Sequence, residues 1–193
     1  MRSLPGFEEL RSLGNAPRLH PNGFIQLDLD DRERLHVWPD VPVRVRTPAA
    51  PIHDHVFGFE SRAYLGTLVD RRYDLVEDPE GDFELHGVVC YVVGKKDAGL
   101  HRLDDKRYRL VLTDERRVTA PGSYVMPPSI FHESVAEGLA LTVIAMTAPD
   151  PARPARVVCR RGGVPTETFK RDGGPEERER LWSIIGRARR AVL

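Results

Sequence analysis

Residues 51–66 read PIHDHVFGFESRAYLG, and this stretch carries the strongest structural signal in the chain. His53 and His55 are two residues apart, so an extended backbone would project both imidazoles from one face, toward one ion. Glu60 supplies a carboxylate five residues after His55. Imidazole nitrogen and carboxylate oxygen both suit divalent transition metals. Asp54 is expected to point away from the pair and to make a hydrogen bond elsewhere. The stretch therefore predicts a metal site on β-structure.

The rest of the chain is punctuated by sixteen glycines and sixteen prolines. Between them, polar and apolar residues alternate with a period of two, which is typical of half-buried strands. The pattern predicts an all-β fold, a sandwich or closed barrel, over about residues 24–160. The predicted strands are residues 24–30, 34–38, 43–46, 61–75, 83–93, 107–112, 123–126, 139–146 and 156–159.

Two helices are predicted outside this β-core. A short one covers residues 5–13 and ends at Gly14. The other covers about residues 175–191, with proline and acids in its first turn and arginines in its last, which matches the helix dipole. This second helix is amphipathic, and its apolar stripe would pack on the barrel or on a second subunit, so a homodimer stays open. The stripe consists of Leu181, Ile184, Ile185 and Ala188.

Charge and hydropathy narrow the classes of partner. The 193 residues include 29 basic and 29 acidic side chains, so no overall field attracts nucleic acid or an anionic membrane. The opening residues lack the apolar core of a signal peptide, and no stretch approaches the ~20 apolar residues that cross a bilayer. We expect a single cytoplasmic domain over residues 1–193 that binds a small molecule and neither nucleic acid nor membrane.

A second informative stretch, residues 122–132, reads GSYVMPPSIFH. The two prolines would break a strand, and the residues after them would return His132 to the sheet. An isolated His-x-His pair is usually a surface feature, but Glu60 and His132 in an all-β chain favour a metal site.

Both stretches resemble the motifs of the cupin superfamily. The first motif is matched by His53, His55, Glu60 and Gly66, and the second by Gly122, Pro127 and His132, with Ser129 and Ala136 in place of its glycine and asparagine.

This resemblance implies a cupin double-stranded β-helix, or jelly-roll barrel, that holds one divalent metal ion, with Fe(II) favoured. The implied ligands are His53, His55, Glu60 and His132. Residues in step with the ligands would line a substrate pocket. The candidate substrate-binding residues are Arg62 and Tyr64, which keep step with Glu60, and Arg44 and Arg46, which lie on a strand that enters the site.

The implied function is that of a mononuclear Fe(II) oxygenase or dioxygenase acting on a small organic molecule. The IHDH run also resembles that of thiol dioxygenases, which use three histidines without a carboxylate, whereas Glu60 offers a fourth ligand here. Two alternatives stay open. One is a non-redox cupin, an isomerase, decarboxylase or lyase using Zn, Mn or Ni, with Glu60 as catalytic base. The other is a barrel that binds a small ligand or metal without catalysis.

Overall fold

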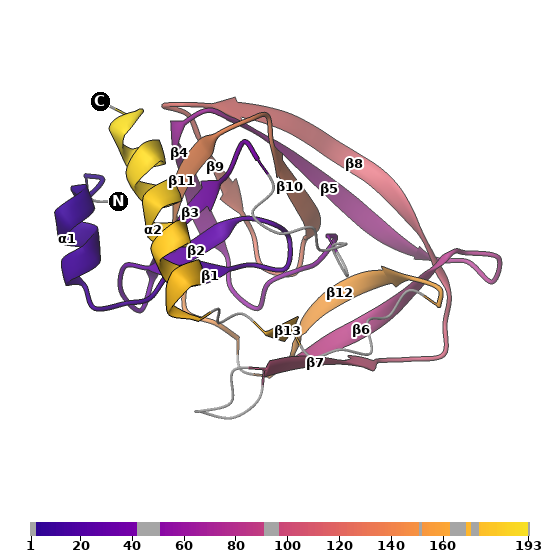
Figure 1. Ribbon diagram of the computed structural model, residues 1–193. Coiled ribbons are helices and arrows are strands. Elements are labelled where there is room, and N and C mark those ends of the chain that lie inside the picture. The colour runs from indigo at the N-terminus through magenta and orange to yellow at the C-terminus, as the bar shows by residue number, and fades with distance from the viewer. Residues whose placement is uncertain are drawn as a thin grey trace.

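The computed structural model describes residues 3–41, 51–90, 97–150, 152–162, 169–170 and 174–192. Within these residues the chain forms two antiparallel sheets, with two helices at one end (Figure 1). The strand order is β1-β2-β3-β11-β4-β9 in the first sheet and β10-β5-β8-β6-β7-β13 in the second, where β12 pairs with β6. The predicted all-β, double-sheet fold with flanking helices is thus confirmed.

The strands of the first sheet are β1 (Arg18–Leu19), β2 (Ile25–Asp28), β3 (Glu33–Trp38), β4 (Phe59–Leu65), β9 (Ser123–Met126) and β11 (Ala140–Met146). Those of the second are β5 (Thr67–Glu77), β6 (Phe83–Cys90), β7 (Asp97–Arg102), β8 (Tyr108–Thr119), β10 (Phe131–Ala136), β12 (Ala155–Arg160) and β13 (Phe169–Lys170). The helices are α1 (Phe7–Ser12) and α2 (Pro175–Arg190). The predicted strand 43–46 lies outside the described residues.

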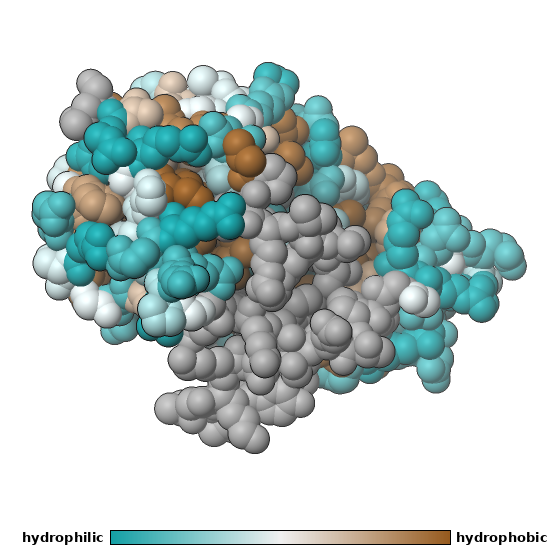
Figure 2. Space-filling model, in the orientation of Figure 1, coloured by the Kyte–Doolittle hydropathy of each residue, from teal (hydrophilic) through white to brown (hydrophobic). Residues whose placement is uncertain are grey.

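The outer face of the first sheet is covered by the two helices. Alternate residues of β2 and β3, such as Leu27 and Leu35, are fully buried there because they pack against Leu181 and Ile185 of α2. Each such side chain contributes roughly 1.5–3 kcal/mol when buried. The apolar stripe of α2 therefore packs on its own sheet. Neither helix is long and apolar enough, among the described residues, to cross a membrane, and in Figure 2 hydrophilic residues cover much of the surface around them.

The predicted strand 61–75 is two strands, because the backbone turns at Gly66. Gly66 has a φ of +73°, which side chains with a Cβ rarely adopt. A Cβ added there would also lie 2.4 Å from the Leu139 carbonyl oxygen and 2.9 Å from the Ala140 Cβ. The turn sends β4 into the first sheet and β5 into the second, so Gly66 connects the two layers.

We expect Gly66→Ala to lower the free energy of unfolding by about 3 kcal/mol, since it adds both backbone strain and a close contact. Gly138→Ala is a matched control, because Gly138 has a φ of +84° but no atom within 4 Å of an added Cβ. Urea denaturation should give a loss of only about 1 kcal/mol for this control. Equal losses for the two variants would contradict the close packing described at Gly66.

The space between the sheets contains both apolar and polar side chains. Two buried apolar clusters lie there, one around Phe59 and Met126 and one around Phe24 and Trp38. Buried polar residues accompany them, including Asp70 and His132. Because buried polar groups are stable only when they have partners, this mixture marks the interior as the place to look for a functional site.

Candidate metal centre

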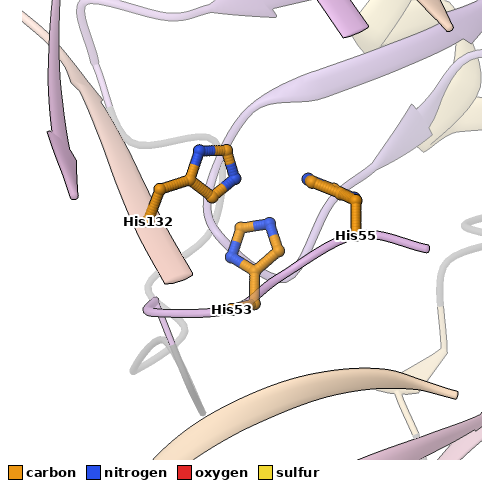
Figure 3. Close-up of side chains that lie close together, drawn as sticks. All are labelled: His53, His55 and His132. Carbon is orange, nitrogen blue, oxygen red and sulfur yellow. The ribbon is translucent and has the colours of Figure 1, made fainter. Parts of the chain in front are cut away.

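Three imidazoles converge between the sheets. The ligand nitrogens of His53, His55 and His132 all lie within 4.8 Å of one another, and Figure 3 shows the three rings turned toward a common point. Ring centroids are 4.8 Å apart for His53 and His55, and 4.9 Å for His53 and His132. Nitrogens that share one first-row ion at ~2.1 Å are at most about 4.2 Å apart, so a small side-chain adjustment would bring all three to it.

Backbone hydrogen bonds hold the first two histidines in place. The segment before β4 lies as a short bridge between β10 and β12. The backbone N–H of His53 donates to the His132 carbonyl oxygen at 3.1 Å, and the His132 N–H donates to the His53 carbonyl oxygen at 2.9 Å. The Asp54 N–H donates to the Arg156 carbonyl oxygen at 2.8 Å. This extended conformation gives His53 and His55 the same side, as strand alternation predicts. It also fixes their distance from His132 on β10.

The polar contacts of Nδ1 indicate which nitrogen of His53 and of His132 can bind a metal. His53 Nδ1 lies 2.9 Å from the Pro51 carbonyl oxygen, and because a carbonyl only accepts, Nδ1 carries the proton and Nε2 the lone pair. His132 Nδ1 lies 3.4 Å from the fully buried Asp70 carboxylate. Such carboxylate and carbonyl contacts typically orient histidine ligands. Both histidines therefore present Nε2 for coordination.

The burial and charge state of the imidazoles fit a metal ion. His132 is only 3% exposed, and both its ring nitrogens are buried without a hydrogen-bond partner among the described residues. Burial, helped by the neighbouring imidazoles of His53 and His132, lowers the pKa of His55 well below its usual range. His55 is therefore neutral, which is the form that binds metals. A divalent ion would satisfy the unpartnered Nε2 of His132, while Nδ1 faces the Asp70 carboxylate without a hydrogen bond to it.

Asp54 anchors the segment from its opposite face. Its carboxylate is fully buried and accepts from Arg156 Nε at 2.8 Å and from Arg153 Nη1 at 3.0 Å. Arg153 also donates to the His55 carbonyl oxygen at 2.8 Å, and the Arg156 guanidinium lies over the Phe131 ring. Asp54 thus points away from the imidazoles and fixes the backbone that carries them.

The structure does not bring Glu60 to the three histidines. Glu60 is exposed, and its register partner Val125 is 62% exposed. The neighbouring Phe59 points inward instead, with its ring 5.4 Å from the His55 ring. Because β4 alternates regularly, the inward position of Phe59 forces Glu60 outward. The predicted roles of Glu60 as ligand and base therefore do not agree with this placement.

The same alternation moves the predicted substrate-binding residues away from the site. Arg62 is exposed on the outer face of β4, with its guanidinium 5.7 Å from the centre of the Tyr64 ring. Tyr64 packs against the cluster beneath α2. Arg44 and Arg46 lie outside the described residues. The structure instead places Phe57, stacked 4.8 Å from His55, and Phe59 next to the histidines.

We expect Glu60→Gln to leave the metal content unchanged, because an exposed carboxylate on the far face of β4 cannot reach the cluster. Elemental analysis of the variant and the wild type, loaded in parallel, would measure this. Arg62→Gln, on the same face, is the matched control for a surface change. A loss of bound metal in Glu60→Gln alone would restore Glu60 to the ligand set.

No family model and no curated protein matches the chain. Among solved structures it is similar to the X-ray structure of E. coli ycfD, with 13% sequence identity and a TM-score of 0.34. The match covers 96% of this chain and 60% of the ycfD chain, so this chain spans less than two thirds of the length of ycfD. The fold and the site define a double-sheet β-protein with a three-histidine cluster that could bind a metal ion.

Proposed function

We propose that this protein is a metal-dependent enzyme of the cupin type, with one Fe(II) ion bound by His53, His55 and His132, that oxidises a small organic molecule with dioxygen. The observation that supports it best is the convergence of three largely buried imidazoles without a carboxylate among them in the described part of the chain. The balanced charge of the chain supports a small-molecule partner.

A bound Fe(II) ion would supply redox chemistry toward dioxygen and open coordination positions for substrate. The chain's own residues do the rest. Three neutral imidazoles leave the charge of the ion uncompensated, so it would attract an anionic or electron-rich group. Phe57 and Phe59 cover the sides of His55 with aromatic rings, which restricts water there. The Asp70 carboxylate lies 3.4 Å from His132 Nδ1, a placement that would help turn Nε2 toward the ion.

Nitric oxide tests the proposal without a known substrate. It binds Fe(II) at an open position as dioxygen would, and it gives a high-spin iron–nitrosyl signal in electron paramagnetic resonance. We expect this signal from anaerobically Fe(II)-loaded wild type and none from His55→Ala. Loading with iron but no nitrosyl signal would argue against an oxygenase and for the non-redox alternative.

A non-redox role is the second candidate, and the donor set supports it. Three histidines with an open fourth position are also a catalytic zinc arrangement, in which the ion polarises a carbonyl or activates water. Preferential retention of zinc over iron, together with activity that does not depend on dioxygen, would favour this function.

A further inference from the structure

A row of polar side chains crosses the inner face of the first sheet. Arg18 is the register partner of Gln26, Gln26 of His36, and His36 of Thr142. Register partners project from the same face, so these four residues form one row, which we call the polar row. Gln26 is 5% exposed and Thr142 1% exposed. A buried face of this composition is unusual for a barrel filled only by its own side chains.

The polar row faces the histidine cluster. The next row along these strands pairs Asp28 with Arg34, Arg34 with Ile144, and Ile144 with Ser61. Ser61 lies two residues from Phe59 on β4, so both project inward, and Phe59 contacts the cluster. The two rows therefore share their face with the side chain that covers the metal centre.

Asp28 organises the guanidinium groups at one end of this face. Arg34 Nε lies 3.2 Å from one of its oxygens, Gln26 Nε2 lies 3.0 Å from the same oxygen, and Arg18 Nη2 binds the other. Burial alone would raise the pKa of Asp28, but the hydrogen bond from Gln26 and the charges of both arginines lower it. Asp28 is therefore an ionised acceptor that fixes both guanidinium groups.

Several buried nitrogens on this face have no hydrogen-bond partner in the described part of the chain. Arg18 Nε and Trp38 Nε1 are buried without a hydrogen-bond partner among the described residues, and so is His36 Nε2. The first two are obligatory donors. Burial, with a further contribution from Arg34, lowers the pKa of His36 to about 3, so His36 is neutral. Unpartnered buried donors are costly, and a ligand that accepts hydrogen bonds would remove that cost.

The two arginines of this face are partly open to solvent, and Arg34 is close to the metal centre. The Arg34 guanidinium lies 5.8 Å from the centre of the Phe57 ring, and that ring stacks on His55. One aromatic ring thus separates the guanidinium from a ligand imidazole. The side chains of Arg18, Asp28 and Arg34 are 32%, 31% and 32% exposed, so a molecule from solution can reach them.

We propose that Arg34 and the polar row, which includes Arg18, bind the carboxylate of a small organic acid and hold its other end beside the three histidines. Guanidinium groups held by a fixed acid recognise carboxylates through paired, charge-assisted hydrogen bonds. The remaining obligatory donor, Trp38 Nε1, suits a further oxygen atom of the same molecule. The identity of this acid as the substrate rests on the proposed function, but its binding does not.

Binding of succinate and benzoate to the full-length protein, followed by isothermal titration calorimetry, tests the proposal. Succinamide and benzamide, which lack the carboxylate charge, are the control ligands. We expect at least one acid to bind and its amide not to bind. Arg34→Gln and Arg18→Gln should each weaken acid binding by about tenfold or more, since each removes a charge-assisted contact. Arg71→Gln is the control, because the Arg71 side chain is similarly exposed, at 35%, but lies on the second sheet. This variant should bind the acid as tightly as the wild type does.

The outcomes separate this inference from the metal function. His55→Ala should lose metal yet still bind the acid, and the arginine variants should keep their metal. Acid binding that depends on Arg34 in a protein that takes up no metal would remove the proposed function and leave this inference intact. No binding of either acid, or equal binding by Arg34→Gln and wild type, would overturn the inference whatever the metal content.

Discussion

His55→Ala is expected to reduce metal affinity by at least about a hundredfold while leaving the fold intact. Loss of residues that merely orient a ligand already costs 10–100-fold in affinity, and His55 is one of only three imidazoles in the described cluster. Because its low pKa keeps it neutral, its removal leaves no unpaired charge behind. Equilibrium dialysis against Fe(II) or Zn(II) would measure the affinity, with circular dichroism as the check on folding.

His101→Ala is the control for this variant. His101 is an exposed histidine on β7, so its loss should not change the affinity. A His55→Ala protein that binds metal as tightly as wild type and as His101→Ala would remove the three-histidine cluster as the binding site.

The second large effect is expected for Asp54→Ala, which should lower the free energy of unfolding by about 3 kcal/mol. Removing one partner of a buried ion pair costs roughly 3–5 kcal/mol, and the lower end applies because Arg153 and Arg156 are 24% and 30% exposed. Metal affinity should fall at least about tenfold as well, since the segment that carries His53 and His55 loses its anchor.

Asp114→Ala is the matched control, because Asp114 pairs with Arg116 at the surface, where both side chains are more than a third exposed. Such pairs contribute about 1 kcal/mol or less. Urea denaturation of the metal-free proteins and metal titration of the folded ones give the two readouts. If Asp54→Ala had the same free energy of unfolding and the same metal affinity as Asp114→Ala, Asp54 would have no positioning role.

The local pattern of polar, apolar and charged residues in the sequence was sufficient to predict most strands and the C-terminal helix. Alternating polarity located β2, β3, β9, β11 and β12 to within a few residues, and the charge gradient of α2 predicted its ends. The strand 61–75 was predicted as continuous, and the left-handed backbone of Gly66 divides it. Strand β10 was missing from the predicted strands, although the residues after Pro127 and Pro128 were expected to return His132 to the sheet.

The site was predictable in part, for a physical reason. His53 and His55 come together by strand alternation alone, whereas the approach of His132 needs the pairing of distant segments. Alternation also explains why Glu60 lies away from the histidines: β4 begins at Phe59, whose side chain points inward, so that of Glu60 points outward. Arg18, Asp28 and Arg34 gave no signal, since a charged residue on a strand usually faces solvent. Only the helices on the outer face of the first sheet turn these residues inward.

Elemental analysis of untagged protein, purified without chelator, tests the three-histidine centre most directly. The structure predicts about one equivalent of a divalent metal ion per chain, with iron the metal that the proposed oxygenase needs. Absence of metal from the purified protein, and no uptake after incubation with Fe(II), Mn(II), Ni(II) or Zn(II), would contradict the metal centre.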